Sequence, residues 1–152
     1  MPNMQIKNKN YKYLYGRKFR VGIVVGRFNQ EITDDLLSHA LDTLKKCNMS
    51  KKNITVVSVA GAVEIPYALQ QLARSKKYDF LVALACIIRG DTSHFDWVCK
   101  MAQEGIQRVT LDESIPIGFG VLTTDNLKQA KSRPHVGGEA ALAALELALL
   151  KF

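Results

Sequence analysis

The sequence lacks the features that mark membrane proteins and disulfide-stapled domains. No apolar run approaches the roughly 20 residues that a membrane-spanning helix needs, so we expect neither a membrane protein nor a membrane partner. Only three cysteines are present, Cys47, Cys86 and Cys99, and none belongs to a Cys-x-x-Cys pair. An odd number of isolated cysteines indicates small apolar fillers in a reducing compartment rather than disulfides.

Metal-ligand patterns are also missing, and so are acidic residues near the amino end. The three histidines, His39, His94 and His135, do not show the spacing of a metal site, so we expect no metal. Residues 1–20 carry six basic residues and no acidic one, which leaves 15 basic and 14 acidic residues in the rest of the chain. We therefore expect a basic, flexible tail over residues 1–18, followed by a domain over 19–152.

This distribution of charge bears on partners and location. A folded body with balanced charge does not favour nucleic acid as a partner, although a reading in which the basic tail alone binds RNA stays open. The tail has no apolar core of signal-peptide length, so we expect no export and a cytoplasmic protein. No internal repeat of the solenoid kind is evident.

What is present is a regular alternation of apolar runs and helical patterns, in a chain of 152 residues that suits one domain. The apolar runs predict strands at 19–25, 54–60, 80–88 and 117–122. Helices are predicted from 65 onward and over 34–48, 93–111, 126–132 and 139–150. Such alternation favours a parallel sheet covered on both faces, so we predict a single-domain α/β protein, a three-layer α/β/α sandwich with a four-stranded sheet.

Several local assignments accompany this pattern. Thr33 is predicted to cap the first helix, and residues 123–125 to cap the short helix at 126–132. Residues 133–138 are predicted to form a loop. The last helix carries alanine and leucine on nearly every face, with Glu146 as its only interior polar residue. We expect such a helix to be buried on more than one side, the second side being a subunit interface.

The sequence is most informative where the strands end. In an open parallel sheet, ligands bind outside the carboxyl ends of the strands, and the loops at 26–30, 61–64, 86–94 and 123–125 all fall there. The buried run 80–88 passes through Arg-Gly-Asp-Thr-Ser into a helix, with Gly90 suited to a tight turn or a close ligand. A helix that opens there presents free N–H groups to an anion. His94 could then move protons beside a bound phosphate, while an ordinary joint with a surface histidine is equally consistent with the spacing alone.

Taken together, these loops resemble the lumazine synthase family. The matching motifs are Gly26-Arg27-Phe28-Asn29, Gly61-Ala62-Val63-Glu64-Ile65-Pro66, Ile88-Arg89-Gly90-Asp91-Thr92-Ser93-His94-Phe95-Asp96 and Gly118-Phe119-Gly120-Val121-Leu122-Thr123-Thr124-Asp125, with Arg133 eight residues further on. The resemblance implies a flavodoxin-like fold and a transferase of riboflavin biosynthesis. Such an enzyme condenses 5-amino-6-(D-ribitylamino)uracil with 3,4-dihydroxy-2-butanone 4-phosphate and releases phosphate and water. It implies no metal and no organic cofactor.

The resemblance also implies roles for individual residues. Phe28 matches the ring that stacks on the pyrimidine, and Glu64 matches the carboxylate that binds the ribityl hydroxyls, beside backbone groups of Ala62 and Val63. The uracil site is lined by positions that match Cys86, Ile87 and Ile88; threonine, whose hydroxyl cysteine lacks, is more usual at the first of these. Asp91 and Thr92 match the phosphate loop, Arg133 matches the guanidinium that clamps the phosphate, and His94 matches the proton-transfer residue.

The resemblance makes assembly part of the expected mechanism. Phe119 matches a residue that the family donates to the active site of a neighbouring subunit, so we expect shared active sites in a homopentamer; a decamer or a sixty-subunit shell built from pentamers is open. Riboflavin synthase is a further candidate partner. A lysine that many members carry after Arg133 is missing, and the 133–138 connection is short. The competing interpretation is a homologue that binds lumazines or riboflavin without making them.

Overall fold

The computed structural model describes residues 14–152 and contains one parallel sheet of four strands. The strands are β1 (Val21–Gly26), β2 (Ile54–Val59), β3 (Phe80–Ile88) and β4 (Ile117–Thr124), in the spatial order β2-β1-β3-β4. β1 pairs with both β2 and β3, and β4 lies at the edge beside β3. The predicted sheet is confirmed, with its strands within two residues of the expected bounds.

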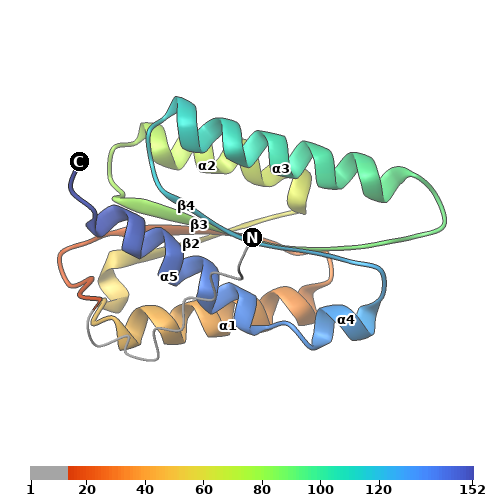
Figure 1. Ribbon diagram of the computed structural model, residues 1–152, viewed down its shortest axis with the longest axis horizontal. Helices are drawn as coiled ribbons and strands as arrows, with labels where there is room; N and C mark the ends of the chain where they lie inside the picture. Colours follow the sequence, from red (N-terminus) through yellow and green to blue (C-terminus); the bar gives the residue numbers. More distant parts are fainter. Residues whose placement is uncertain (1–13) are drawn as a thin grey trace.

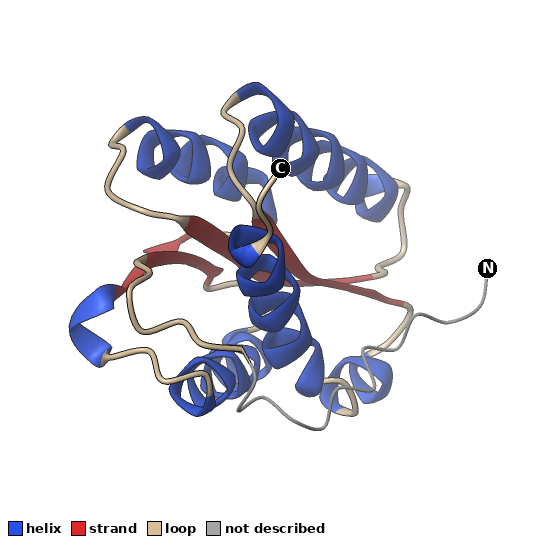
Figure 2. Ribbon diagram, turned by 60° about the vertical axis from the view of Figure 1, so that its left-hand side comes forward, coloured by secondary structure: helices blue, strands red, loops and turns tan. Residues whose placement is uncertain are grey.

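Helices cover both faces of the sheet, as Figures 1 and 2 show. One face carries α1 (Gln30–Lys46), α4 (Leu127–Lys131) and α5 (His135–Leu149), and the other carries α2 (Ile65–Arg74) and α3 (His94–Asp112). Two short 3-10 turns, η2 (Lys51–Asn53) and η3 (Ala62–Glu64), flank β2. Because both faces are covered, β1 and β3 are buried almost throughout and read as continuous apolar runs. The predicted three-layer α/β/α sandwich is therefore confirmed.

The first helix begins earlier than predicted, and Thr33 does not cap it. α1 starts at Gln30 after Asn29, which adopts the left-handed region at φ 56°. Asparagine tolerates that region better than most residues, and the Asn29 side chain is held by a 2.9 Å hydrogen bond to the carbonyl oxygen of Cys86. Thr33 lies buried within the first turns, where its hydroxyl donates to the Gln30 carbonyl.

The predicted loop at 133–138 is wrong, because α5 begins at His135. Gly137 and Gly138 pack directly on α1: a β-carbon at Gly137 would meet the backbone of Leu36, and one at Gly138 would meet the Thr43 side chain. The two glycines thus bring the helices into close contact. Most apolar residues of α5 are consequently buried within the chain itself, whereas Ala143 and Leu147 are exposed.

The short helix α4 is capped differently from the prediction. Thr123 and Thr124 belong to β4, and the cap of α4 is Asn126, whose side-chain oxygen accepts a 2.9 Å hydrogen bond from the Gln129 N–H. A side-chain oxygen at this position satisfies a backbone donor that has no partner within the helix.

The structure describes the amino end of the chain only from residue 14 onward. Residues 1–13, most of the expected flexible tail, lie outside the described residues. Of the remainder, Leu14 packs against the core and the Gly16 N–H donates to the Cys47 carbonyl at 2.8 Å. Among residues 14–152, none of the helices combines the length and apolarity required to traverse a lipid bilayer.

Candidate functional site

The carboxyl ends of β1, β2 and β3 surround a cavity of about 460 Å³. It lies where the chain order reverses, since β1 and β3 are neighbours and β2 lies on the far side of β1. Ligands of open α/β sheets bind at this switch point. The cavity brings together nine of the predicted site residues: Phe28, Ala62, Val63, Glu64, Cys86, Ile87, Ile88, Thr92 and His94.

Phe28 stands at the rim of this cavity. The loop that carries it is fixed to the end of β2, because the Arg27 N–H donates to the Val59 carbonyl and the Phe28 N–H donates to the Ala60 carbonyl, at 2.9 and 3.0 Å. The ring itself is 73% exposed. It lies so close to Gly61 that a β-carbon there would come within 3.2 Å of the ring. An aromatic face held on a fixed backbone and left open is suited to stacking on a planar ligand.

The second wall is the η3 turn that leads into α2. Ala62 is buried, whereas Glu64 is exposed and its carboxylate has no hydrogen bond or ion pair with any residue in 14–152. Pro66 occupies the first turn of α2, where its missing N–H leaves no helical bond unmade. Glu64 is thus an acceptor available to hydroxyl groups of a ligand.

The third wall is the end of β3 and the turn that opens α3. The Thr92 hydroxyl accepts a 3.3 Å hydrogen bond from the His94 N–H, and α3 begins at His94 with 19 residues of aligned peptide dipoles behind it. Gly90 does not have the positive φ that a tight turn can require, and a β-carbon there would meet open space. Asp91 is exposed and does not line the cavity.

Cys86 lines the cavity as a neutral thiol. Its side chain is 3% exposed, and burial raises the pKa of the thiol to about 11. Because only the thiolate is an effective nucleophile, Cys86 near neutral pH serves as an apolar wall. No group of three metal-ligating side chains is found within residues 14–152.

Besides Asp91, two predicted site residues do not line this cavity. Phe119, which is 45% exposed, lines a second hollow of about 780 Å³ between α3 and β4. Arg133 lies outside both hollows, and its guanidinium donates to the Gln129 carbonyl at 2.7 Å and to the Ser132 hydroxyl at 3.0 Å. Phe119 lies on the edge strand β4 itself and Arg133 lies between α4 and α5, so neither residue lines the cavity that contains His94 of the same protomer.

The match to a known family covers this whole arrangement. A family model for 6,7-dimethyl-8-ribityllumazine synthase matches residues 18–151 of the 152-residue chain. The chain belongs to the lumazine synthase family. The match includes all four strands and both hollows, so the resemblance noted in the loops extends over the complete domain.

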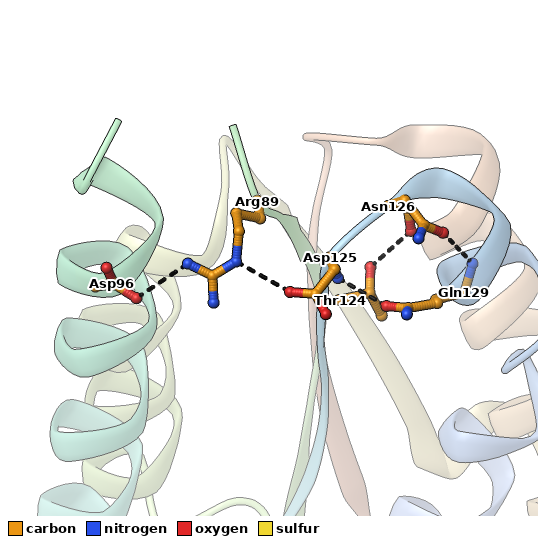
Figure 3. Close-up of polar contacts among 6 residues, drawn as sticks. All are labelled: Arg89, Asp96, Thr124, Asp125, Asn126 and Gln129. Atoms are coloured by element: carbon orange, nitrogen blue, oxygen red, sulfur yellow. Dashed lines mark hydrogen bonds and ion pairs between the residues drawn. The ribbon is translucent and has the colours of Figure 1, made fainter. Parts of the chain in front are cut away.

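Sequence reasoning assigned no role to Arg89, which lines the second hollow of this lumazine synthase domain. Figure 3 shows its guanidinium between two carboxylates: Nε lies 3.0 Å from Asp125 Oδ1, and an Nη atom lies 3.6 Å from Asp96 Oδ1. The hydrogen bond to Asp125 raises the pKa of Arg89 further. The available signal was an arginine directly after the third strand with an aspartate directly after the fourth.

Proposed function

We propose that this protein is a 6,7-dimethyl-8-ribityllumazine synthase, which joins 5-amino-6-(D-ribitylamino)uracil to 3,4-dihydroxy-2-butanone 4-phosphate with release of phosphate and water. The observation that carries the proposal is the single cavity onto which three separate loops bring Phe28, Glu64 and His94, in a chain of this family. These three side chains, which are proposed to bind the pyrimidine and to transfer a proton, come from one protomer.

The pyrimidine is proposed to lie between Phe28 and the end of β3. The open ring of Phe28 stacks on the heterocycle, and the Cys86–Ile88 segment forms the floor. The carboxylate of Glu64, which has no partner among residues 14–152, accepts hydrogen bonds from ribityl hydroxyls, with backbone groups of Ala62 and Val63 beside it. Charge-assisted bonds to a carboxylate are stronger than neutral ones, which favours a hydroxyl-rich side chain at this wall.

The phosphate is proposed to lie at the amino end of α3. Backbone N–H groups of Asp91 and Thr92, together with the positive end of the helix dipole, favour an anion there. The Asp91 side chain is directed away from the cavity, which avoids repulsion between carboxylate and phosphate. A planar guanidinium suits phosphate oxygens, and we assign this part to Arg133 of a second copy because the protomer's own Arg133 lies outside the cavity.

His94 is proposed as the proton-transfer residue. The 5-amino group of the pyrimidine attacks the ketone and forms an imine with loss of water, and a proton is then removed from carbon as phosphate leaves. The resulting enol becomes a carbonyl, the ribitylamino nitrogen attacks this carbonyl, and a second water is lost as the ring closes. An imidazole titrates near neutral pH and can both accept and deliver these protons. Since the two substrates are held side by side, their alignment supplies a large part of the rate gain independently of His94.

A site completed by Phe119 and Arg133 requires neighbouring copies, so we propose a homopentamer with shared active sites. Decamers and sixty-subunit shells are larger forms of the same assembly. Riboflavin synthase is a candidate partner. Native mass spectrometry measures the assembly directly. We place the protein in the cytoplasm, which suits the free thiols of the three cysteines.

The test is an assay with both purified substrates, following lumazine fluorescence and phosphate release together. Equal amounts of the two products support the synthase. Binding of 6,7-dimethyl-8-ribityllumazine or riboflavin without turnover would instead establish a non-catalytic homologue. The matched control for His94→Ala is His39→Ala, because His39 is exposed on α1 and lines neither hollow.

A further inference from the structure

Arg89 occupies the boundary between the cavity and the second hollow. It is the residue after β3, and its side chain lines the hollow that contains Phe119 and Asp125 rather than the cavity that contains His94. Its guanidinium therefore points away from the proposed phosphate position. A basic side chain in this place is not suited to be a ligand of the substrate.

The contacts of Arg89 tie three elements together. Its N–H donates to the Thr124 carbonyl at the end of β4 at 2.9 Å, and its Nε lies 3.0 Å from Asp125 in the following loop. On the other side, its guanidinium lies 4.4 Å from the centre of the Phe95 ring and 3.6 Å from Asp96, both in the first turn of α3. One planar group thus fixes the start of α3 relative to the end of β4.

The chain of hydrogen bonds continues toward Arg133, as Figure 3 shows for its first part. The Asp125 N–H donates to Gln129 Oε1 at 2.8 Å, and the Gln129 N–H donates to the Asn126 side chain at 2.9 Å. The Gln129 carbonyl in turn accepts the 2.7 Å bond from Arg133. The same bridge that holds the turn before α3 therefore also holds the short helix that positions Arg133.

The turn over residues 90–93 has few other anchors. Among the described residues, its hydrogen bonds are the local bond from the His94 N–H to Thr92 and those from the Asp96 and Trp97 N–H groups to the Ser93 carbonyl, and a β-carbon at Gly90 would meet open space. We propose that Arg89 is a positioning residue of the phosphate subsite: through Asp125 and Asp96 it holds the N–H groups of this turn where the phosphate binds. This inference rests on the proposed function.

The kinetic test compares Arg89→Gln and Asp125→Asn with the wild-type protein. We expect the KM for 3,4-dihydroxy-2-butanone 4-phosphate, and the inhibition constant for inorganic phosphate, to rise on the order of tenfold, since a displacement of about 1 Å can cost about a hundredfold. The KM for the pyrimidine should not change. A merely structural role would shift both KM values together, and that result, or no change in either, overturns the proposal.

The matched control is Arg74→Gln. Arg74 forms an ion pair of similar length with Glu113, at 2.9 Å, and joins α2 to the residue after α3 at the far end of that helix. Its loss removes one bridge between elements without touching the phosphate subsite, so both KM values should stay at wild-type levels. An Arg74→Gln effect equal to that of Arg89→Gln would show that any such bridge matters equally, against the proposal.

Two further variants test whether Arg89 acts through Asp125. If Asp125 acts only through Arg89, the double variant Arg89→Gln/Asp125→Asn should be no worse than Arg89→Gln alone. Arg89→Lys keeps the charge and loses the planar fork, so it should recover only part of the phosphate affinity. Multiplying effects in the double variant, or full recovery with lysine, would contradict an action through this bridge.

Hydrogen–deuterium exchange separates this inference from the proposed function. In Arg89→Gln, the amides of residues 90–96 should exchange faster while those of β1 and β3 keep their protection. If the wild-type protein makes no lumazine, the proposed function fails, and the exchange result still decides whether Arg89 holds the turn. Unchanged exchange over 90–96 overturns the positional role whatever the kinetics show.

Discussion

Removing the Phe28 ring should weaken pyrimidine binding without weakening the fold. The ring is 73% exposed in the unliganded protein, so Phe28→Ala deletes little buried surface. Exposed substitutions of this kind usually change stability by less than about 0.5 kcal/mol. Aromatic stacking contributes about 0.5–1.5 kcal/mol, so its loss corresponds to a rise of about 2- to 13-fold in the KM for the pyrimidine.

Gly61→Ala provides a smaller perturbation of the same contact. Gly61 is extended, at φ −162°, so its backbone accepts alanine, but the new β-carbon would come within 3.2 Å of the Phe28 ring. The ring must move by a few tenths of an ångström, and we expect a KM change in the same direction but smaller than that of Phe28→Ala.

Steady-state kinetics with each substrate varied in turn, together with thermal denaturation, checks both variants. The KM for the phosphorylated ketone and the melting temperature should stay close to wild type. A fall in melting temperature of several degrees for Phe28→Ala would show that the ring is a structural cap. An unchanged pyrimidine KM would refute the stacking role.

Three other outcomes follow from the site. His94→Ala should lower kcat by about 10²- to 10⁴-fold and leave measurable turnover; complete loss in a folded protein would make His94 indispensable. If active sites are shared, co-refolding His94→Ala with Arg133→Ala should restore activity above either variant alone, because some sites then receive both native residues; no recovery would place the site within one protomer. The Cys86 thiol, with its pKa raised by burial to about 11, should alkylate slowly at pH 8 and faster toward pH 11, and rapid alkylation at pH 8 would contradict its burial. The contribution of the buried thiol to stability is present below the ordinary thiol pKa and is lost as pH rises through 11.

The sequence predicted those walls of the cavity that are formed by residues close together in the chain. The apolar run from Phe80 to Ile88 is followed at once by the Arg-Gly-Asp-Thr-Ser turn, and both its strand and the helix after it were located within one residue. A buried strand and a helix start are encoded by neighbouring residues. In contrast, Asn29 replaced Thr33 as the start of α1 because its side chain bonds to Cys86, far away in the sequence.

The role of the two glycines in α5 could not be predicted from their local context. Two successive glycines favour a loop when only neighbours in sequence are considered. In the folded chain, Gly137 and Gly138 are helical because the backbone of α1 lies where their side chains would be. Close packing between distant helices thus overrides local propensity.

By itself, the sequence determined the alternation of strands and helices, the loops that end each strand, and the residue types suited to a pyrimidine, a phosphate and a proton transfer. These are properties of short segments, because apolar periodicity and turn chemistry act over a few residues. Only the tertiary structure decided which loops meet. The strand order β2-β1-β3-β4 places Phe28, Glu64 and His94 around one cavity and leaves Phe119, which is on the edge strand, and Arg133 outside it, since strand order depends on packing between segments far apart in the chain.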